Sequence, residues 1–265
     1  MERRYVKALA LAVALAVAAA VAVPAATQGA GEPPRDASAL LRAVVDNLRG
    51  GPLWGTYTFV VERPGRTAEY VMEVVTDGDE RGLIRIVAPP REAGQAFLMD
   101  GNDLWLYNAR LGRSLRLPPS GRSNAFLGSD VSYNDMVGRD LETGYTAAFA
   151  PPGAAERDGA GVDIVLELTP RPGAPTPYGR ALVGVEEARL IPRWVDYYDQ
   201  RGQVVKRLTL AEYLEAGDWR VPTHMVVEDA TREGYRTVVR LTDVELDAAV
   251  PEACFALQAL ERGCR

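Results

Sequence analysis

A β-hairpin signature in the middle of the chain constrains the fold more than any other feature. Two apolar runs, at 97–99 and 104–107, flank the turn sequence Asp-Gly-Asn-Asp. A Gly-Asn pair between two apolar runs is typical of a hairpin with a two-residue loop. The residue pairs that this loop predicts are Phe97–Leu106, Leu98–Trp105 and Met99–Leu104. Directly paired residues share a face, so both faces of the hairpin are apolar and neither is expected to face open water.

A similar alternating pattern extends through most of the chain. Apolar and polar residues recur with a period of two, which is typical of strands with one buried face. The strands that we expect cover residues 54–62, 67–76, 82–87, 96–99, 104–107, 114–117, 145–150, 162–168, 181–187, 193–199, 204–212, 219–228 and 235–246. About a dozen strands at near-regular spacing, with few helices, predict a mainly β fold, either a barrel or a sandwich.

One amphipathic helix is expected before the strands, at 36–49. Its apolar residues fall on one face at helical spacing, and two glycines end it. At the other end of the chain, apolar residues around 255–260 suggest a short closing element. The helix is therefore expected to pack against the sheet through its apolar face.

The first 25 residues have the pattern of a secretory signal peptide. A basic start precedes an unbroken Ala/Leu/Val run at 8–23, and small residues surround Ala25. This run is shorter than the roughly 20 residues that span a bilayer, although a retained N-terminal anchor is an alternative interpretation. Residues 26–35 form a Gly/Pro-bearing tether, and we expect 36–265 to fold as a single domain. Export and cleavage would place the protein in the periplasm.

Charge and cysteine content narrow the class of partner. The formal net charge is -6, which argues against nucleic acid as a partner, because nucleic-acid binding usually requires a basic surface. A local group of arginines, Arg110, Arg113 and Arg116, can contact lipid headgroups or an acidic partner, or form a solvated basic face. The two cysteines, Cys254 and Cys264, can form a disulfide in an oxidising compartment, but the sequence leaves open whether they are bridged or free.

The chain lacks the usual signatures of catalysis. It contains no G-x-S-x-G, P-loop, G-x-G-x-x-G or H-E-x-x-H motif, and its single histidine, His224, falls on the polar face of a strand. Asp130 and Asp135 form the best candidate carboxylate pair for glycoside hydrolysis, but their Ser/Asn-rich turn favours a capping role. We therefore expect no enzyme activity, no catalytic residues, no metal site and no cofactor.

The second hairpin strand and the segment after it combine a Trp-x-Tyr strand, a basic segment with spaced arginines and an F-x-G-S/T-D-x-S-Y-x-D box. This combination closely resembles the signature of the LolA-like outer-membrane lipoprotein-sorting proteins. The matching residues here are Trp105, Tyr107, Arg113, Arg116, Phe126, Gly128, Ser129, Asp130, Ser132, Tyr133 and Asp135. Further matches are Tyr178, Tyr197, Tyr198, Asp199, Gly202 and Lys206. The resemblance extends over roughly 40–260, almost the whole mature chain.

The resemblance implies an incomplete antiparallel β-barrel, a LolA/LolB-like half-barrel whose hollow is covered by helices and holds acyl chains. Aromatic and methionine side chains recur on one face of several expected strands, where they either fill a core or line a cavity. The resemblance favours the cavity. The candidate lipid-binding residues are Tyr57, Phe59, Tyr70, Met72, Phe97, Met99, Trp105, Phe126, Leu127, Tyr133 and Met225. The candidate lids are the segment Ser120 to Met136 and the Pro-rich loop Arg171 to Gly179.

The function that this resemblance implies is a monomeric periplasmic carrier. It would bind lipid acyl chains in a hydrophobic cavity and move lipoproteins or lipids toward the outer membrane. An inner-membrane exporter would deliver the cargo and an outer-membrane acceptor would receive it. The alternative is an envelope regulatory module that uses the same fold to sense lipids or lipoproteins.

Overall fold

The structure is a computed structural model that describes residues 36–264, apart from 79, 102, 134, 136–143, 156–160, 175 and 218. The expected signal peptide and tether, and Met136 of the first lid candidate, lie outside the described residues. The described residues all belong to one compact unit, Pro33–Arg265. No helix in this described part is long and apolar enough to cross a membrane.

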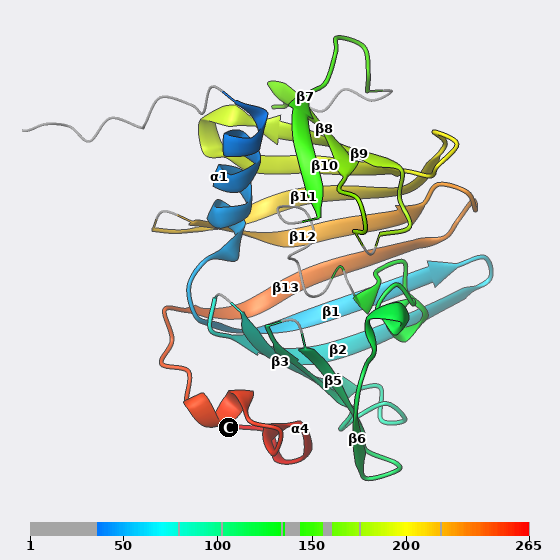
Figure 1. The fold of residues 1–265 in the computed structure, drawn as a ribbon. Helices are drawn as coiled ribbons and strands as arrows, with labels where there is room; N and C mark the ends of the chain where they lie inside the picture. Colours follow the sequence, from blue (N-terminus) through cyan, green and yellow to red (C-terminus); the bar gives the residue numbers. More distant parts are fainter. Residues whose placement is uncertain are drawn as a thin grey trace, which may run out of the picture. The chain divides into compact units, whose positions relative to one another are not determined.

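One antiparallel sheet dominates this unit (Figure 1). Its described strands are β1 (Leu53–Arg63), β2 (Arg66–Thr76), β3 (Arg81–Ala88), β4 (Ala96–Asp100), β5 (Asp103–Asn108), β6 (Arg113–Arg116), β7 (Tyr145–Phe149), β8 (Ile164–Pro170), β9 (Arg180–Glu186), β10 (Ile191–Tyr198), β11 (Val204–Ala216), β12 (Trp219–Asp229) and β13 (Arg236–Leu246). The expected mainly β fold is confirmed, and most strand ends lie within a few residues of the expected ones.

The strand order explains why the sheet stays open. The first strand, β1, pairs with the last strand, β13, and from this central pair the strands run outward in sequence order to β6 on one side and β7 on the other. Neighbouring strands are joined mostly by short turns, so each half is a meander. The two edge strands do not pair with each other in the described part of the chain. The sheet is therefore an incomplete barrel, as the resemblance implied.

The central hairpin has the predicted register. Phe97 pairs with Leu106, Leu98 with Trp105 and Met99 with Leu104. Phe97 and Leu104 are almost fully buried on one face, and Leu98 is almost fully buried on the other. Both faces of the hairpin are covered, which explains why the sequence shows two apolar faces here.

Helix α1 (Ala37–Arg49) covers one end of the sheet (Figure 1). The Asp36 side chain caps the helix by accepting a 2.7 Å hydrogen bond from the Ala39 amide. Its apolar face, with Leu40 and Val44 buried, packs against strands β7 to β10. The helix ends at Gly50, where φ is +62° and a Cβ atom would lie 2.1 Å from the Trp219 ring. A glycine is therefore required at this C-cap both by backbone conformation and by space.

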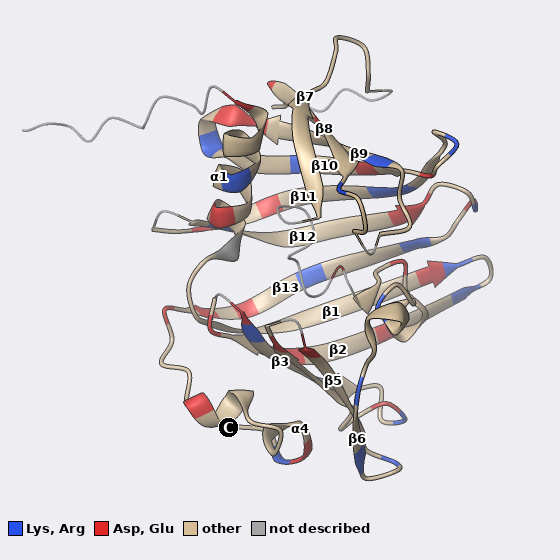
Figure 2. Cartoon of the chain, viewed as in Figure 1, with Lys and Arg blue, Asp and Glu red and all other residues tan. Residues whose placement is uncertain are grey.

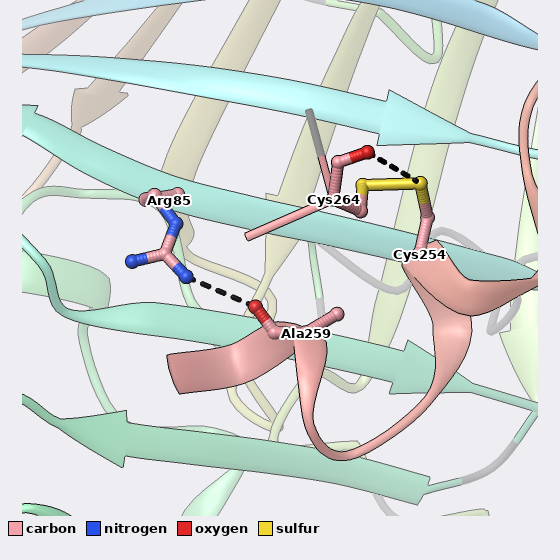
Figure 3. Close-up of a disulfide and its surroundings, with 4 residues drawn as sticks. All are labelled: Arg85, Cys254, Ala259 and Cys264. Carbon is pink, nitrogen blue, oxygen red and sulfur yellow. Dashed lines mark hydrogen bonds between the residues drawn. A yellow bond between two sulfur atoms is a disulfide. The ribbon is translucent and has the colours of Figure 1, made fainter. Parts of the chain in front are cut away.

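The C-terminal segment covers the face of β2 to β5 that carries Leu98 and Trp105, which we call the outer face. It consists of the short helices η4 (Glu252–Phe255) and α4 (Ala259–Arg262). Cys254 and Leu260 are fully buried against Leu98 and other side chains of that face. A disulfide joins Cys254 to Cys264, and the Arg85 Nη2 donates to the Ala259 carbonyl at 2.9 Å (Figure 3). The bridge that the sequence left open is thus present, and it closes the segment on itself.

Candidate functional site

The inner face of the sheet, which we define as the face that carries Phe59, Met72 and Phe97, holds a continuous apolar surface. The buried side chains at its centre are Phe59, Val61, Tyr70, Met72, Val74, Ile84, Ile86, Phe97, Leu104, Val227, Val239 and Leu241. Tyr57, Met99 and Met225 pack against them and are half-buried. Leu208 contacts both this cluster and the cluster beneath α1. The apolar surface therefore extends across both halves of the sheet.

A strap, which we define as residues 117–133, crosses this surface and is drawn in green in front of β1 and β2 in Figure 1. It contains the short helices η1 (Pro119–Gly121) and η2 (Phe126–Gly128) and is otherwise irregular. Its own pairing is local, because the Phe126 amide donates to the Val131 carbonyl at 2.7 Å and Ala125 bridges Ser132. Beyond its first residue, the strap adds no strand to the sheet.

Phe126 is the apolar centre of the strap. It is 1% exposed and lies among three aromatic rings of the inner-face cluster, with ring centroids 4.9 Å from Phe97, 5.5 Å from Tyr133 and 5.7 Å from Phe59. The edge-on arrangement of these rings is the favourable one for aromatic pairs. The next residue, Leu127, has φ +52°, a left-handed conformation that is strained for a residue with a bulky side chain. The strap is thus well packed at one residue and strained at the next.

A buried polar latch, made of Arg63, Asp130 and Thr237, holds the strap to the end of β1 and β13. Arg63 Nη1 donates to Asp130 Oδ2 at 2.8 Å, and the two side chains are 10% and 4% exposed. The Thr237 hydroxyl donates to the same carboxylate at 2.8 Å and accepts from the Asp130 amide at 3.0 Å. Arg63 also donates to the Gly128 carbonyl. Because the Asp130 carboxylate is almost buried, loss of these partners would leave its charge uncompensated, which is energetically costly.

A second polar contact lies just past the strap. Asp135 accepts from the Ser132 amide and hydroxyl, and it forms an ion pair with Lys206 of β11. The Lys206 side chain is only 10% exposed and lies over the Tyr197 ring, 5.3 Å from its centroid. Burial disfavours the ammonium, but the Asp135 carboxylate and the Tyr178 side chain outweigh it and hold the pKa of Lys206 above its ordinary value.

Tyr178 connects the second lid candidate to this group. Its ring stacks on Tyr197 with centroids 4.5 Å apart, and burial raises the pKa of its hydroxyl. The loop that carries it is fixed by a hydrogen bond between the Tyr145 and Thr176 hydroxyls at 2.7 Å. Asp135, Tyr178, Tyr197 and Lys206, which are far apart in the sequence, therefore meet on the inner face.

In the structure, the candidate site residues fall into three groups: residues of the inner face and strap, Trp105 on the other face, and arginines at the β6 edge. Ten of the candidate lipid-binding residues lie in the inner-face cluster or the strap: Tyr57, Phe59, Tyr70, Met72, Phe97, Met99, Phe126, Leu127, Tyr133 and Met225. Trp105 does not, because it pairs with Leu98 and packs on the opposite face against the C-terminal segment. Placing Trp105 in the cavity was wrong, since its position in the hairpin puts it on the other side of the sheet.

The three candidate headgroup arginines lie at the β6 edge, away from the strap centre. Arg113 is exposed, Arg116 pairs with Asp103, and Arg110 donates to the Arg91 carbonyl. Figure 2 shows this edge in blue. The turn beside it exposes Leu111 by 69%. These arginines therefore form a solvated basic edge and do not line the buried surface.

A separate groove of about 420 Å³ lies at the tips of β11, β12 and β13. It is lined mainly by charged side chains such as Arg207, Glu228 and Arg232, so it does not resemble an acyl-chain site. Among the described residues, no group of three or more His, Cys, Asp and Glu side chains could hold a metal ion. The inner face is thus the candidate site with the composition suited to an apolar ligand.

Comparisons with known proteins support this assignment of the fold. A family model, described only as that of an uncharacterized protein, matches residues 78–262. The structure of a protein domain described as outer membrane lipoprotein-sorting, from Vibrio parahaemolyticus, has a TM-score of 0.75 with this chain at 24% identity, covering 85% of this chain and 98% of that one. The chain belongs to the family of this model, and its fold is LolA-like.

Two further structures share the LolA-like fold. A DUF1329 family protein from Desulfovibrio piger has a TM-score of 0.74 at 24% identity, covering 84% of this chain and 97% of that one. A LolA superfamily protein from Nitrosomonas europaea has a TM-score of 0.68 at 22% identity, covering 85% and 99%. No curated protein matches the sequence. At these identities the likeness establishes the LolA-like fold, and function has to be argued from the site.

The sequence alone did not single out the partners of the strap. Arg63 and Thr237 are 67 and 107 residues from Asp130 along the chain, and neither has a local pattern that marks it. Lys206 matched the family pattern, but nothing in its strand predicted burial beside Asp135. The one available signal was the box itself, whose Asp130 and Asp135 are the two residues that fasten the strap.

Proposed function

We propose that this LolA-like protein is a periplasmic carrier that binds lipid acyl chains on the inner face of its sheet. It moves lipids or lipoproteins toward the outer membrane, between an inner-membrane exporter and an outer-membrane acceptor, and it acts as a monomer. The N-terminal signal pattern supports export, and the printed description of the Vibrio parahaemolyticus relative, outer membrane lipoprotein sorting, supports the class of cargo.

The observation that carries the proposal is the way in which the apolar inner face is covered. Its centre is closed by a strap whose most buried apolar side chain is Phe126, and the strap is fastened by polar contacts of Asp130 and Asp135 at its C-terminal end. In the described part of the chain, the backbone–backbone hydrogen bonds of residues 118–133 run within that stretch. Departure of the strap therefore breaks the polar latch but no hydrogen bond between strands of the sheet. The strap can therefore leave while the sheet remains folded, and it would uncover a surface suited to an acyl chain.

The energetic balance favours exchange of the strap for a lipid. Burial of an acyl chain contributes about 0.8 kcal/mol for each CH₂ group, so ten groups contribute roughly 8 kcal/mol. Removal of Phe126 from its site costs about 3–5 kcal/mol of packing, as for a buried aromatic side chain, and the conformational freedom that the strap regains offsets part of this cost. The two terms are close enough for binding that remains reversible, which a carrier requires.

The test is displacement of a fluorescent fatty-acyl probe from delipidated protein. We expect micromolar or tighter binding by the unmodified protein, and tighter binding by Phe126→Ser, because the closed strap competes less well for the inner face. Leu111→Ser, at the exposed turn beside β6, is the matched control and should bind like the unmodified protein. Failure of both the unmodified protein and Phe126→Ser to bind acyl probes would refute the proposal.

A further inference from the structure

Lys206 is a strand residue whose charged side chain, 10% exposed, the structure buries on the inner face itself. It lies two residues before Leu208 on β11, and Leu208 contacts both apolar clusters of that face. Its strand neighbour in the register is Tyr197, whose ring lies below the ammonium. The cation therefore sits on the apolar surface and not at its solvated margin.

The counterion of Lys206 belongs to a segment that can be removed. Asp135 follows directly on the strap, and its carboxylate is held in position by the Ser132 amide and hydroxyl. If the strap leaves, Asp135 leaves with it, and a nearly buried ammonium remains on an apolar face. A buried charge without a counterion is costly, so the open state requires a new anion at Lys206.

The strap thus places an aromatic ring and a carboxylate on the inner face in the order of the tail and head of an amphiphile. Phe126 fills the apolar centre, Tyr133 contacts it with centroids 5.5 Å apart, and Asp135 ends the series at Lys206. We propose that Lys206 binds the anionic headgroup of the lipid and that the strap is an internal mimic of that lipid, with Asp135 in the headgroup site.

This inference rests on the proposed carrier function and names its ligand class. The ligand has an acyl tail and a compact anionic head, either a carboxylate or a phosphate monoester, because both accept charge-assisted hydrogen bonds from an ammonium. The Tyr178 side chain, which also stabilises the ammonium of Lys206, lies beside the same site. Acyl compounds with uncharged heads satisfy the tail site but leave Lys206 without a counterion, so they bind more weakly.

The test compares twelve-carbon ligands that differ only in the head: dodecanoate, dodecyl phosphate, dodecanol and dodecyltrimethylammonium. Each displaces the uncharged fluorophore N-phenyl-1-naphthylamine from delipidated protein. We expect the better of the two anions to bind the unmodified protein at least about tenfold more tightly than dodecanol, as one charge-assisted hydrogen bond provides, and the cation to bind most weakly. Which anion is better distinguishes a carboxylate site from a phosphate site.

Variants assign this preference to a residue. Lys206→Met should abolish the preference for anions, while dodecanol binds at least as tightly, because the strap is also loosened. Lys206→Arg should retain the preference. Asp135→Asn should tighten anion binding, because the internal competitor has lost its charge. Arg113→Met, at the exposed β6 edge, is the matched control and should leave the preference unchanged.

The outcomes separate this inference from the carrier function. If dodecanol and the anions bind equally well to the unmodified protein, the carrier proposal stands and the headgroup site is wrong. If Arg113→Met removes the preference and Lys206→Met does not, the headgroup lies at the β6 edge and Lys206 is excluded. If no ligand displaces the fluorophore from any variant, both proposals fall. The comparison on unmodified protein remains decisive even if Lys206→Met does not fold.

Discussion

Phe126 and Phe97 touch each other and are equally buried, but they belong to different parts of the molecule. Phe97→Ala removes an aromatic side chain from a strand, and we expect the free energy of unfolding to fall by about 3–5 kcal/mol. Phe126→Ala should cost less than half as much, because the strap opens before the sheet unfolds and limits the loss. Urea denaturation of both variants makes this comparison. Equal losses would mean that the strap folds as part of the core.

Asp130 offers a second prediction for single residues. Asp130→Asn weakens the hydrogen bonds to Arg63 and Thr237 and leaves the guanidinium of Arg63 with a neutral partner. We expect amide hydrogen exchange at Phe126 and Tyr133, which donate within the strap, to become at least about tenfold faster. The amides of β1 and β13 should exchange at their original rates. Faster exchange in the strands as well would show that the latch stabilises the sheet and not the strap alone.

The alternation of side chains between the two faces of a strand explains what the sequence could predict at individual positions. Alternation placed Phe59, Met72 and Phe97 on one face, and the structure agrees. The same pairing rule, applied to the hairpin, puts Trp105 on the other face of the sheet. Alternation by itself therefore removes Trp105 from the candidate lipid-binding residues. Arg63 and Lys206 could not be assigned from the sequence, because their partners lie on the strap and a long-range contact leaves no local periodicity.

Among the elements, the C-terminal segment provides a prediction that does not involve the inner face. The disulfide joins residues separated by 10 positions, and closing such a loop stabilises a segment by roughly 3 kcal/mol. In the Cys254→Ser, Cys264→Ser double variant, we expect this segment to open more often and to expose the outer face near Trp105. Tryptophan fluorescence should shift to longer wavelength, and proteolysis should remove the segment while the sheet remains. An unchanged spectrum and cleavage rate would show that packing alone holds the segment.

The elements themselves were largely predictable. Strong period-two patterns and turn residues identified the strands, and the hairpin register followed from a two-residue loop. The short helices of the strap were less predictable, because η2 has three residues and includes the left-handed Leu127. Its form depends on burial of Phe126 by strands that are distant in sequence, which is tertiary information.

For the whole molecule, the N-terminal pattern predicts export with cleavage near Ala25. N-terminal sequencing of protein recovered from the periplasm should begin between Ala26 and Gly31. The chain lacking residues 1–25 should melt at the same temperature as the exported protein and bind acyl probes equally well, because the sheet and strap lie wholly beyond this segment. Recovery of membrane-bound protein that begins at Met1 would contradict cleavage.

The strand order of the whole sheet was beyond the reach of local patterns. A chain of antiparallel strands can close into a barrel, fold into a sandwich or stay open, and the alternation is the same in each case. The deciding contact is the pairing of β1 with β13, about 180 residues apart. That pairing leaves β6 and β7 as separate edges and the inner face open to a strap.

In the proposed carrier, acyl chains reach the inner face only when the strap opens. The Thr237 hydroxyl contacts both the amide and the carboxylate of Asp130, at 3.0 and 2.8 Å, so the test places a disulfide across the latch in an Asp130→Cys, Thr237→Cys variant, whose formation is checked by thiol titration. Acyl-probe binding is measured with this bond oxidised and then reduced, with the unmodified protein under both conditions as the control for the native disulfide. We predict no binding in the oxidised variant and full binding after reduction. Equal binding in both states would show that acyl chains reach the inner face without opening of the strap.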